Sequence, residues 1–176
     1  MEDSDSKNKT AEVCLEVQGL WKIFGKKAKE ILNSELRSAT KKSLLETTGC
    51  VMAVRDVSFS VKEGEFFVIM GLSGSGKSTL IRMLLRLIDS TSGTVYIHGE
   101  DICQYDKRQL MNFRRHTTGM VFQYFGLFPH RSILDNVAYG LKVQGVSMEE
   151  RYKRAQEAIE TVGLTGWEQY MPSALS

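Results

Sequence analysis

The sequence predicts an α/β domain with an antiparallel β portion ahead of its central strand. Residues 66–70 (FFVIM) form a short apolar run typical of a buried strand, and residues 78–88 (STLIRMLLRLI) carry apolar side chains at helical spacing. A glycine-rich loop at residues 71–76 joins them. Strand, glycine loop and helix in this order form a common unit of sheets covered by helices. With 176 residues, 42% of them hydrophobic, the chain can build one such core.

Two strands are expected before this central unit. Residues 11–20 alternate apolar and polar side chains, and apolar residues recur through 54–61. Residues 26–50 between them are basic and helix-prone, which favours a surface helical insertion over a direct functional role. Residues 1–10 (MEDSDSKNKT) are polar and predict a disordered tail. Five apolar side chains are expected to anchor the insertion: Ile31, Leu32, Leu36, Leu44 and Leu45.

The rest of the chain is predicted to alternate strands and helices. Strands are expected at residues 94–98 and 118–122 (TGMVF), the second of them buried. Helices are expected at residues 107–115, capped by Asp106, and after two further capping sequences. In each of those sequences a serine stands three residues before an acidic side chain: Ser132 with Asp135, and Ser147 with Glu150.

The segment at residues 71–79 (GLSGSGKST) has the composition of a phosphate-binding loop. Glycines let the backbone turn its N–H groups toward an anion, and the following helix adds unpaired N–H donors. Lys77 is expected to reach the β- and γ-phosphates of a nucleoside triphosphate, and the Ser78 hydroxyl suits Mg²⁺. The residues expected to contact nucleotide phosphates are Gly71, Ser73, Gly74, Ser75, Gly76, Lys77, Ser78 and Thr79.

Other interpretations of these residues have less support. If the loop were an ordinary flexible Gly/Ser segment, its fixed offsets of glycine, lysine and serine would have arisen by chance, which ordinary composition makes rare. Ser73 and Ser75 have no accompanying base, so nucleophilic catalysis is not indicated. His98, His116 and His130 lack the spacing of metal ligands and are expected at the surface or in turns.

Charge and cysteine content restrict the expected partners and compartment. The formal net charge of +2 is too small to indicate nucleic acid as a partner. Cys14, Cys50 and Cys103 are widely spaced, odd in number and not preceded by a secretion signal, which predicts reduced thiols in the cytoplasm. No apolar run is long enough to cross a bilayer, so any membrane link is expected to pass through a partner.

Several motifs together resemble the ATP-binding subunits of ABC transporters. They are Phe24 in KIFG, the loop GLSGSGKST, Gln123 in VFQ and the later helices. The resemblance runs from Leu15 onward. It is most specific to the glycine betaine/L-proline importer type, which has a similar helical insertion and a segment like FPHRSILDN. It implies the N-terminal part of a P-loop NTPase domain over residues 11–176, with an antiparallel β subdomain and the insertion at residues 26–50.

The resemblance also implies roles for individual residues. Phe24 matches the aromatic that stacks on adenine, whereas composition alone favours an ordinary core aromatic. Gln123 matches a glutamine that contacts Mg²⁺ and the attacking water, whereas alone it would be a solvated loop residue. The catalytic candidates are therefore Lys77 and Gln123, and the metal candidates are Ser78 and Gln123. Either a permease-facing surface or a small satellite core is expected at Phe125, Leu127, Phe128 and Pro129.

The cofactors and partners expected from the resemblance are those of a transport ATPase. They are ATP and Mg²⁺, transmembrane permease subunits, a homodimer of the full-length form and, indirectly, a periplasmic or extracellular substrate-binding protein. The expected location is the inner face of the plasma membrane, reached through the permease. A betaine- or proline-type solute follows from the resemblance alone.

Leu175 and Ser176 match the first two residues of the family's LSGGQ signature. The rest of that signature, the Walker B residues and the switch histidine are expected outside this chain, which leaves the core sheet incomplete and residues 66–70 with exposed edges. On this expectation the chain binds nucleotide better than it hydrolyses it. A nucleotide-binding regulatory module stays open as an alternative, and so does an unrelated phosphate-loop kinase, for which no lid or phosphoacceptor site is evident.

Overall fold

The computed structural model describes residues 12–122 and 126–175. By backbone proximity the chain divides into two compact units, Met1–Leu110 and Met111–Ser176. The predicted tail at residues 1–10 lies outside the described residues, so its disorder stays a prediction.

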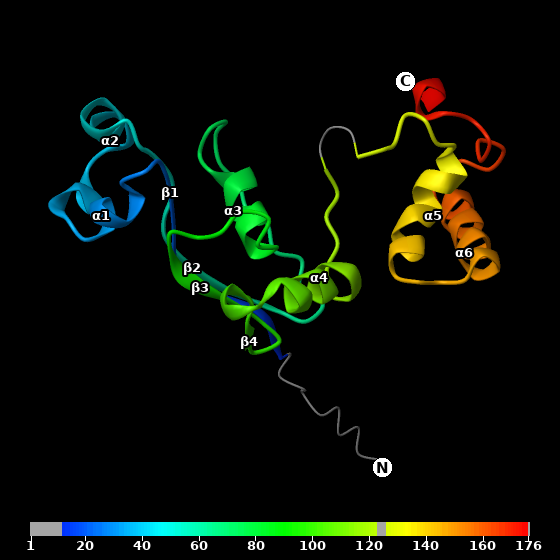
Figure 1. Ribbon diagram of the computed structural model, residues 1–176, viewed down its shortest axis with the longest axis horizontal. Helices are drawn as coiled ribbons and strands as arrows, with labels where there is room; N and C mark the ends of the chain where they lie inside the picture. The colour runs from blue at the N-terminus through cyan, green and yellow to red at the C-terminus, as the bar shows by residue number, and fades with distance from the viewer. Residues whose placement is uncertain (1–11, 123–125, 176) are drawn as a thin grey trace, which may run out of the picture. The chain divides into compact units, whose positions relative to one another are not determined.

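The first unit contains a four-stranded antiparallel sheet in the order β2-β1-β3-β4 (Figure 1). Its long strands β1 (Val13–Phe24) and β2 (Val51–Lys62) pair along their whole length, and Phe24 lies opposite Val51. β3 (Ser92–Ile97) pairs with the other edge of β1, and β4 (Glu100–Asp101) follows through a tight turn. The three strands expected at residues 11–20, 54–61 and 94–98 are therefore confirmed.

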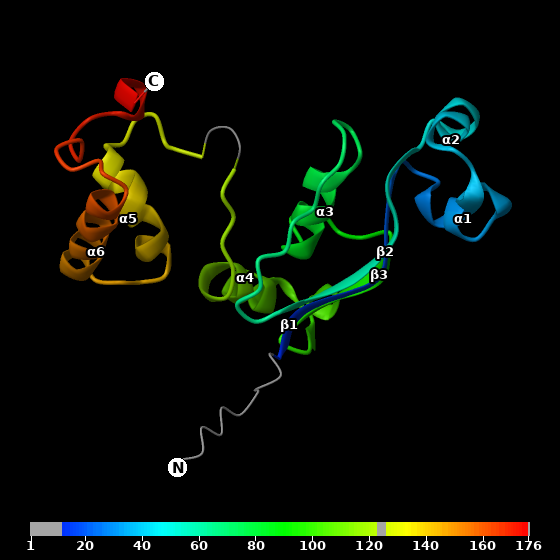
Figure 2. The same cartoon turned by 180° about the vertical axis from the view of Figure 1, so that it is seen from behind.

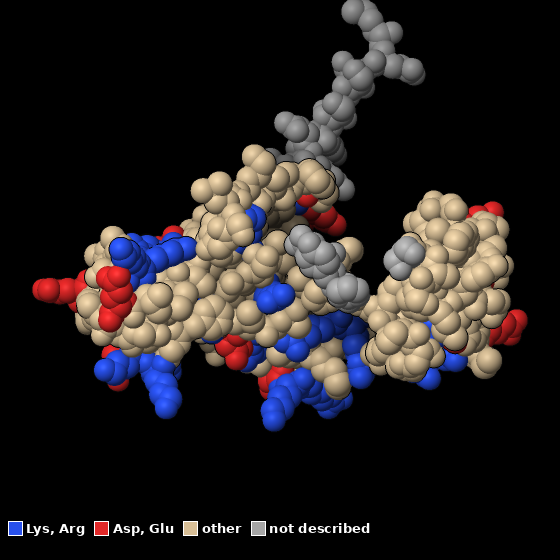
Figure 3. Space-filling view, turned by 90° about the horizontal axis from the view of Figure 1, so that it is seen from above, with Lys and Arg blue, Asp and Glu red and all other residues tan. Residues whose placement is uncertain are grey.

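The segment between β1 and β2 is helical, as the sequence predicts. It contains α1 (Ala28–Leu32), a short 3₁₀ helix (Glu35–Ser38) and α2 (Lys41–Thr48). Figures 1 and 2 show these helices at the end of the β1–β2 pair, and basic and acidic side chains are interspersed over their surface (Figure 3). They cover an apolar cluster formed by Trp21, Ile23, Ile31, Leu44, Cys50 and Met52.

The prediction that Leu45 anchors the insertion is wrong. Leu44 is fully buried, whereas its neighbour Leu45 is 50% exposed. Successive residues of an α-helix point about 100° apart, so α2 cannot direct both leucines into the same cluster.

Helix α3 (Lys77–Leu84) begins at the glycine loop and ends earlier than the predicted residue 88. Arg86 follows it with a left-handed φ of +47°. Its guanidinium donates to the carbonyl oxygens of Ile102 at 3.0 Å and Tyr105 at 2.5 Å. These contacts hold Arg86 against the 3₁₀ turn Ile102–Gln104, so the chain leaves the helical path there.

The two predicted buried strands at residues 66–70 and 118–122 are wrong. Both segments lie outside the sheet of the described residues. Phe66 is 92% exposed, Met70 is 85% exposed and Val121 is 98% exposed. An apolar run supplies side chains suited to a strand, but a strand also needs a neighbouring backbone to pair with. The separate expectation that residues 66–70 have exposed edges is confirmed.

The second unit is helical. Helix α4 (Lys107–His116) crosses the boundary between the units, and α5 (Ile133–Val143) and α6 (Met148–Thr161) follow, with a 3₁₀ turn at Pro172–Leu175. The three expected caps are confirmed, because each side-chain oxygen accepts a hydrogen bond from the backbone N–H three residues later. Helices α5 and α6 share a small core of Ile133, Ala138, Ala155 and Ile159.

No helix in residues 12–122 or 126–175 combines the length and apolar character needed to cross a bilayer.

The apolar cluster under the insertion predicts unequal effects for two adjacent leucines. Leu44→Ala should lower the free energy of unfolding by about 2–5 kcal/mol because it opens a cavity. Leu45→Ala should change it by less than about 0.5 kcal/mol, since the side chain is largely exposed. Urea unfolding followed by Trp21 fluorescence in a Trp167→Phe background measures both. Equal losses would contradict the observed burial.

Candidate functional site

The predicted phosphate-binding loop lies between residue 70 and helix α3. Three of its glycines have positive φ angles: +155° at Gly71, +76° at Gly74 and +106° at Gly76. Side chains with a Cβ rarely adopt these conformations, so the glycines permit the path of the loop. A turn inside the loop is closed by the N–H of Ser75, which donates to the Leu72 carbonyl at 3.2 Å.

Gly76 brings the loop into close contact with strand β2. A Cβ at this position would lie 2.1 Å from the carbonyl oxygen of Ala53, far inside van der Waals contact. A Cβ on Gly71 would lie 2.9 Å from the Ser75 hydroxyl oxygen. Glycine at 76 therefore brings the first turn of α3 directly against the backbone of β2.

Lys77 folds back over the loop. Its ammonium donates to the carbonyl oxygens of Gly71 at 2.7 Å and Leu72 at 2.8 Å, and lies 3.5 Å from the Ser75 hydroxyl. These contacts place one positive charge beside the loop backbone.

The N-terminus of α3 adds backbone donors at the same place. The bond from the Leu80 N–H to the Gly76 carbonyl, at 2.9 Å, closes the first turn. The N–H groups of Lys77, Ser78 and Thr79 precede it, so helix geometry gives them no partner within α3. They carry the positive end of the helix dipole, which favours an anion. Ser73 and Ser78 are exposed, and Thr79 is half-buried.

Phe24 lies near this end of β2. It pairs with Val51, which is two residues from Ala53, a distance of about 7 Å along a strand. Its side chain is 40% exposed, so it is not an ordinary core aromatic. The Lys22 ammonium lies 4.9 Å from the Phe24 ring centroid and donates to the Asp89 carbonyl at 2.6 Å. Lys22 could not be predicted from the sequence, since its contacts depend on residues far along the chain.

The remaining predicted site residues belong to the second unit. Gln123 and Phe125 lie outside the described residues. Phe128 is half-buried and its ring meets Tyr139 edge-on, with centroids 4.6 Å apart. Asn136 accepts from the Phe128 N–H at 2.6 Å and donates to the Phe128 carbonyl at 3.1 Å. Asn136 was not predicted from sequence, although its position four residues after the Ser132 cap places it on the first turn of α5.

No group of three His, Cys, Asp or Glu side chains in the described part of the chain could hold a metal ion.

A glycine loop that opens a helix beside a lysine defines a P-loop domain. Residues 54–176 match the family model described as ABC transporter, and the chain belongs to that family.

Two curated relatives are transport ATP-binding proteins. The chain is 49% identical over 162 residues to the glycine betaine/carnitine transport ATP-binding protein GbuA of Listeria monocytogenes, covering 92% of this chain and 41% of that protein. It is 44% identical to the glycine betaine/proline betaine transport system ATP-binding protein ProV of Escherichia coli, over 92% of this chain and 40% of the relative. The chain thus spans about two fifths of the length of these curated relatives.

A solved structure supports the fold. The dimeric, post-hydrolysis structure of the ATP-binding cassette MJ0796, bound to ADP and Pi, superposes with a TM-score of 0.74 and 31% identity. The match covers 92% of this chain and 63% of that one. The predicted fold class is confirmed.

The contact at Gly76 predicts a difference between two glycines of the loop. Gly74→Ala should lower the free energy of unfolding by about 1–2 kcal/mol, the cost of a left-handed conformation with space for the Cβ. Gly76→Ala should cost more, because its Cβ would also displace the Ala53 carbonyl. Urea unfolding of both variants measures the difference. A loss of unfolding free energy at Gly76 no larger than at Gly74 would contradict the close contact between Gly76 and β2.

Proposed function

We propose that this chain is the nucleotide-binding part of an ABC importer ATPase that serves glycine betaine- or proline-type solutes. The single observation that carries nucleotide binding is that the Lys77 ammonium and the N-terminus of α3 lie together at one glycine loop. The kind of importer is supported by the 49% identity to the Listeria betaine and carnitine subunit.

ATP is the proposed ligand of the loop. The N–H groups of Lys77, Ser78 and Thr79 donate to phosphate oxygens, and the Lys77 ammonium offsets their charge. The loop residues fit a polyanion. Glycine at 71 and 76 lets the loop pack closely against Ser75 and Ala53, so that its backbone can surround the phosphates. The same proposal includes Gly74 and the hydroxyls of Ser73 and Ser75.

Mg²⁺ is the proposed second cofactor. The Ser78 hydroxyl is a hard oxygen donor on the first turn of α3, and the phosphates of the nucleotide supply further oxygens. When bound, the ion neutralises negative charge on the phosphates. Gln123 is proposed as its second protein ligand and, with Lys77, as a catalytic residue.

Phe24 is proposed to stack on the adenine ring. Its exposure leaves ring surface accessible, and Lys22 beside it adds positive charge near the nucleotide. Stacking tolerates different bases, so the phosphates are expected to supply most of the affinity.

The remaining proposals concern the whole protein. Residues 11–176 form part of a nucleotide-binding domain, with residues 26–50 as its insertion. The whole subunit dimerises around ATP, couples hydrolysis to solute uptake through permease subunits at the inner face of the plasma membrane, and works with a substrate-binding protein outside it. The dimeric neighbour MJ0796 supports the dimer.

Removal of the loop ammonium tests nucleotide binding. Lys77→Ala should raise the Kd for ATP about 10- to 150-fold, the equivalent of one charge-assisted hydrogen bond of about 1.5–3 kcal/mol. Isothermal titration calorimetry with Mg²⁺ measures the change. Arg82→Ala, which removes an exposed cation from the last turn of the same helix, is the matched control and should leave the Kd unchanged. Equal affinity of the Lys77 variant and the unmodified chain would refute the proposal.

Base stacking is tested separately. Phe24→Ala should weaken ATP binding by about 1–3 kcal/mol, the usual contribution of one stacked base, and should leave the affinity for inorganic tripolyphosphate unchanged. Calorimetric titrations of both ligands give the comparison. Phe66→Ala serves as the control, since its ring is 92% exposed. If the Phe24 variant loses affinity for both ligands equally, Phe24 supports the fold and does not bind the base.

A further inference from the structure

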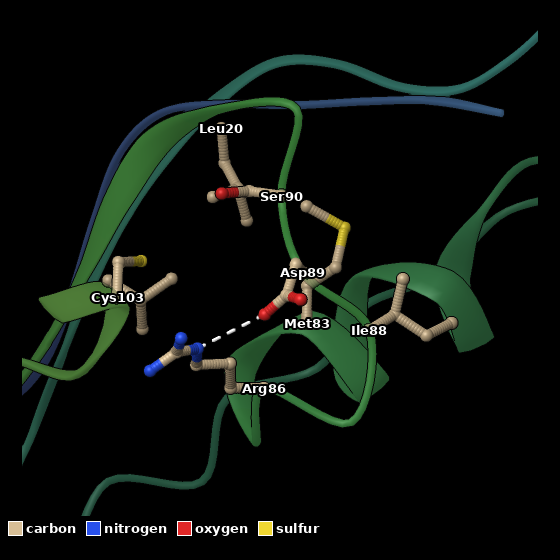
Figure 4. Close-up of a pocket in the computed structure, with 8 residues that line it drawn as sticks. Leu20, Met83, Arg86, Ile88, Asp89, Ser90 and Cys103 are labelled. Atoms are coloured by element: carbon tan, nitrogen blue, oxygen red, sulfur yellow. Dashed lines mark hydrogen bonds and ion pairs between the residues drawn. The ribbon is translucent and has the colours of Figure 1, made fainter. Parts of the chain in front are cut away.

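A cavity of about 170 Å³ lies between the C-terminal end of α3 and the antiparallel sheet (Figure 4). Its deepest walls are apolar: Leu20 of β1 and Val95 of β3 are 0% and 1% exposed, and Met83 of α3 is 3% exposed. Ile88, Ser90 and Cys103 also line it and are half-buried, and Arg86 and Asp89 complete the lining. All of these residues belong to the first unit, at the opposite end of α3 from Lys77.

The rim of the cavity is held in place. The Arg86 guanidinium pairs with the Asp89 carboxylate at 3.1 Å, as Figure 4 shows, and also donates to the carbonyls of Ile102 and Tyr105. These contacts keep a planar cation at the edge of the cavity, above its apolar walls. The thioether of Met83 and the thiol of Cys103 supply two sulfur atoms to the same walls.

We propose that this cavity binds a small, neutral, single-ring aromatic group. Apolar cavities of about 150 Å³ in proteins accept benzene, so the size is sufficient. Sulfur atoms and guanidinium groups interact favourably with aromatic rings, which favours an aromatic over an aliphatic occupant. Charge is disfavoured in the deepest part of the cavity, where Leu20, Met83 and Val95 offer no polar partner. At the rim, the charged groups of Arg86 and Asp89 are paired with each other. The site is independent of the nucleotide function proposed above.

Cys103 provides a direct readout of occupancy. Its thiol is free and lines the cavity. Burial raises the pKa of this thiol, so little thiolate is present near neutral pH and general thiol reagents react slowly. A reagent whose ring enters the cavity is held beside the sulfur and gains from proximity. Cys14 is also half-buried but does not line the cavity, so it serves as an internal comparison.

The test compares two methanethiosulfonate reagents on the full chain, one with a benzyl group and one with a trimethylammonium-ethyl group. In each case the cysteine thiolate attacks the reagent's sulfenyl sulfur, forms a mixed disulfide and releases methanesulfinate. Peptide mass spectrometry gives the rate at each cysteine. The benzyl-to-cationic rate ratio should be at least about tenfold higher at Cys103 than at Cys14. Toluene should slow benzyl labelling of Cys103 and not of Cys14.

A variant that fills the cavity provides a second test. Ser90→Leu places an apolar side chain in the cavity and should remove the benzyl preference at Cys103. Gln104→Leu adds the same side chain at an exposed position outside the lining and should preserve that preference. Equal rate ratios at Cys103 and Cys14, or benzyl labelling of Cys103 that toluene does not slow, would overturn the proposal. Both of these measurements use the unmodified chain, so they decide the question even if the Ser90 variant fails to fold.

Discussion

The candidate site depends on the absence of a side chain at Gly76. The carbonyl oxygen of Ala53 occupies the space that a Cβ would need, so α3 starts in direct contact with β2. This contact fixes where the first amides of α3 and the Lys77 ammonium lie relative to the sheet. Because β2 pairs with β1, it also sets the distance from the loop to Phe24. One backbone contact thus relates the parts proposed to bind phosphates and base.

The segment that precedes the loop contributes little to its position. Residues 66–70 form no strand and are mostly exposed, and the stack of Phe67 on Phe59, with centroids 4.8 Å apart, connects them to β2. Exposed apolar runs of this kind are uncommon on protein surfaces. In the described residues the loop is therefore positioned by α3 and β2 on its C-terminal side. The antiparallel sheet therefore lies next to the candidate site and, through β2, also holds it in position.

Local signals in the sequence predicted much of the fold. The caps at Asp106, Ser132 and Ser147 form as expected because each needs a partner only three residues away. The alternation of apolar and polar side chains predicted the paired strands of the antiparallel sheet. The errors share one cause: residues 66–70 and 118–122 have strand-like side chains without a paired neighbour, and the choice between Leu44 and Leu45 depends on how α2 meets Trp21. Strand pairing and helix packing depend on residues far apart in the sequence, so a local pattern of side chains cannot predict them.

By itself, the sequence determined where the glycine loop lies and predicted that it binds phosphates, since Gly71, Gly74, Gly76, Lys77 and Ser78 stand at the offsets typical of such loops. It also determined the helical character of residues 26–50. Only the tertiary structure decided that Gly76 rests on Ala53, that Phe24 lies beside Lys22, and that Met83 and Cys103 share a cavity. The physical reason is range: loop conformation and helix caps depend on residues within about four positions, whereas strand register and packing join residues dozens of positions apart.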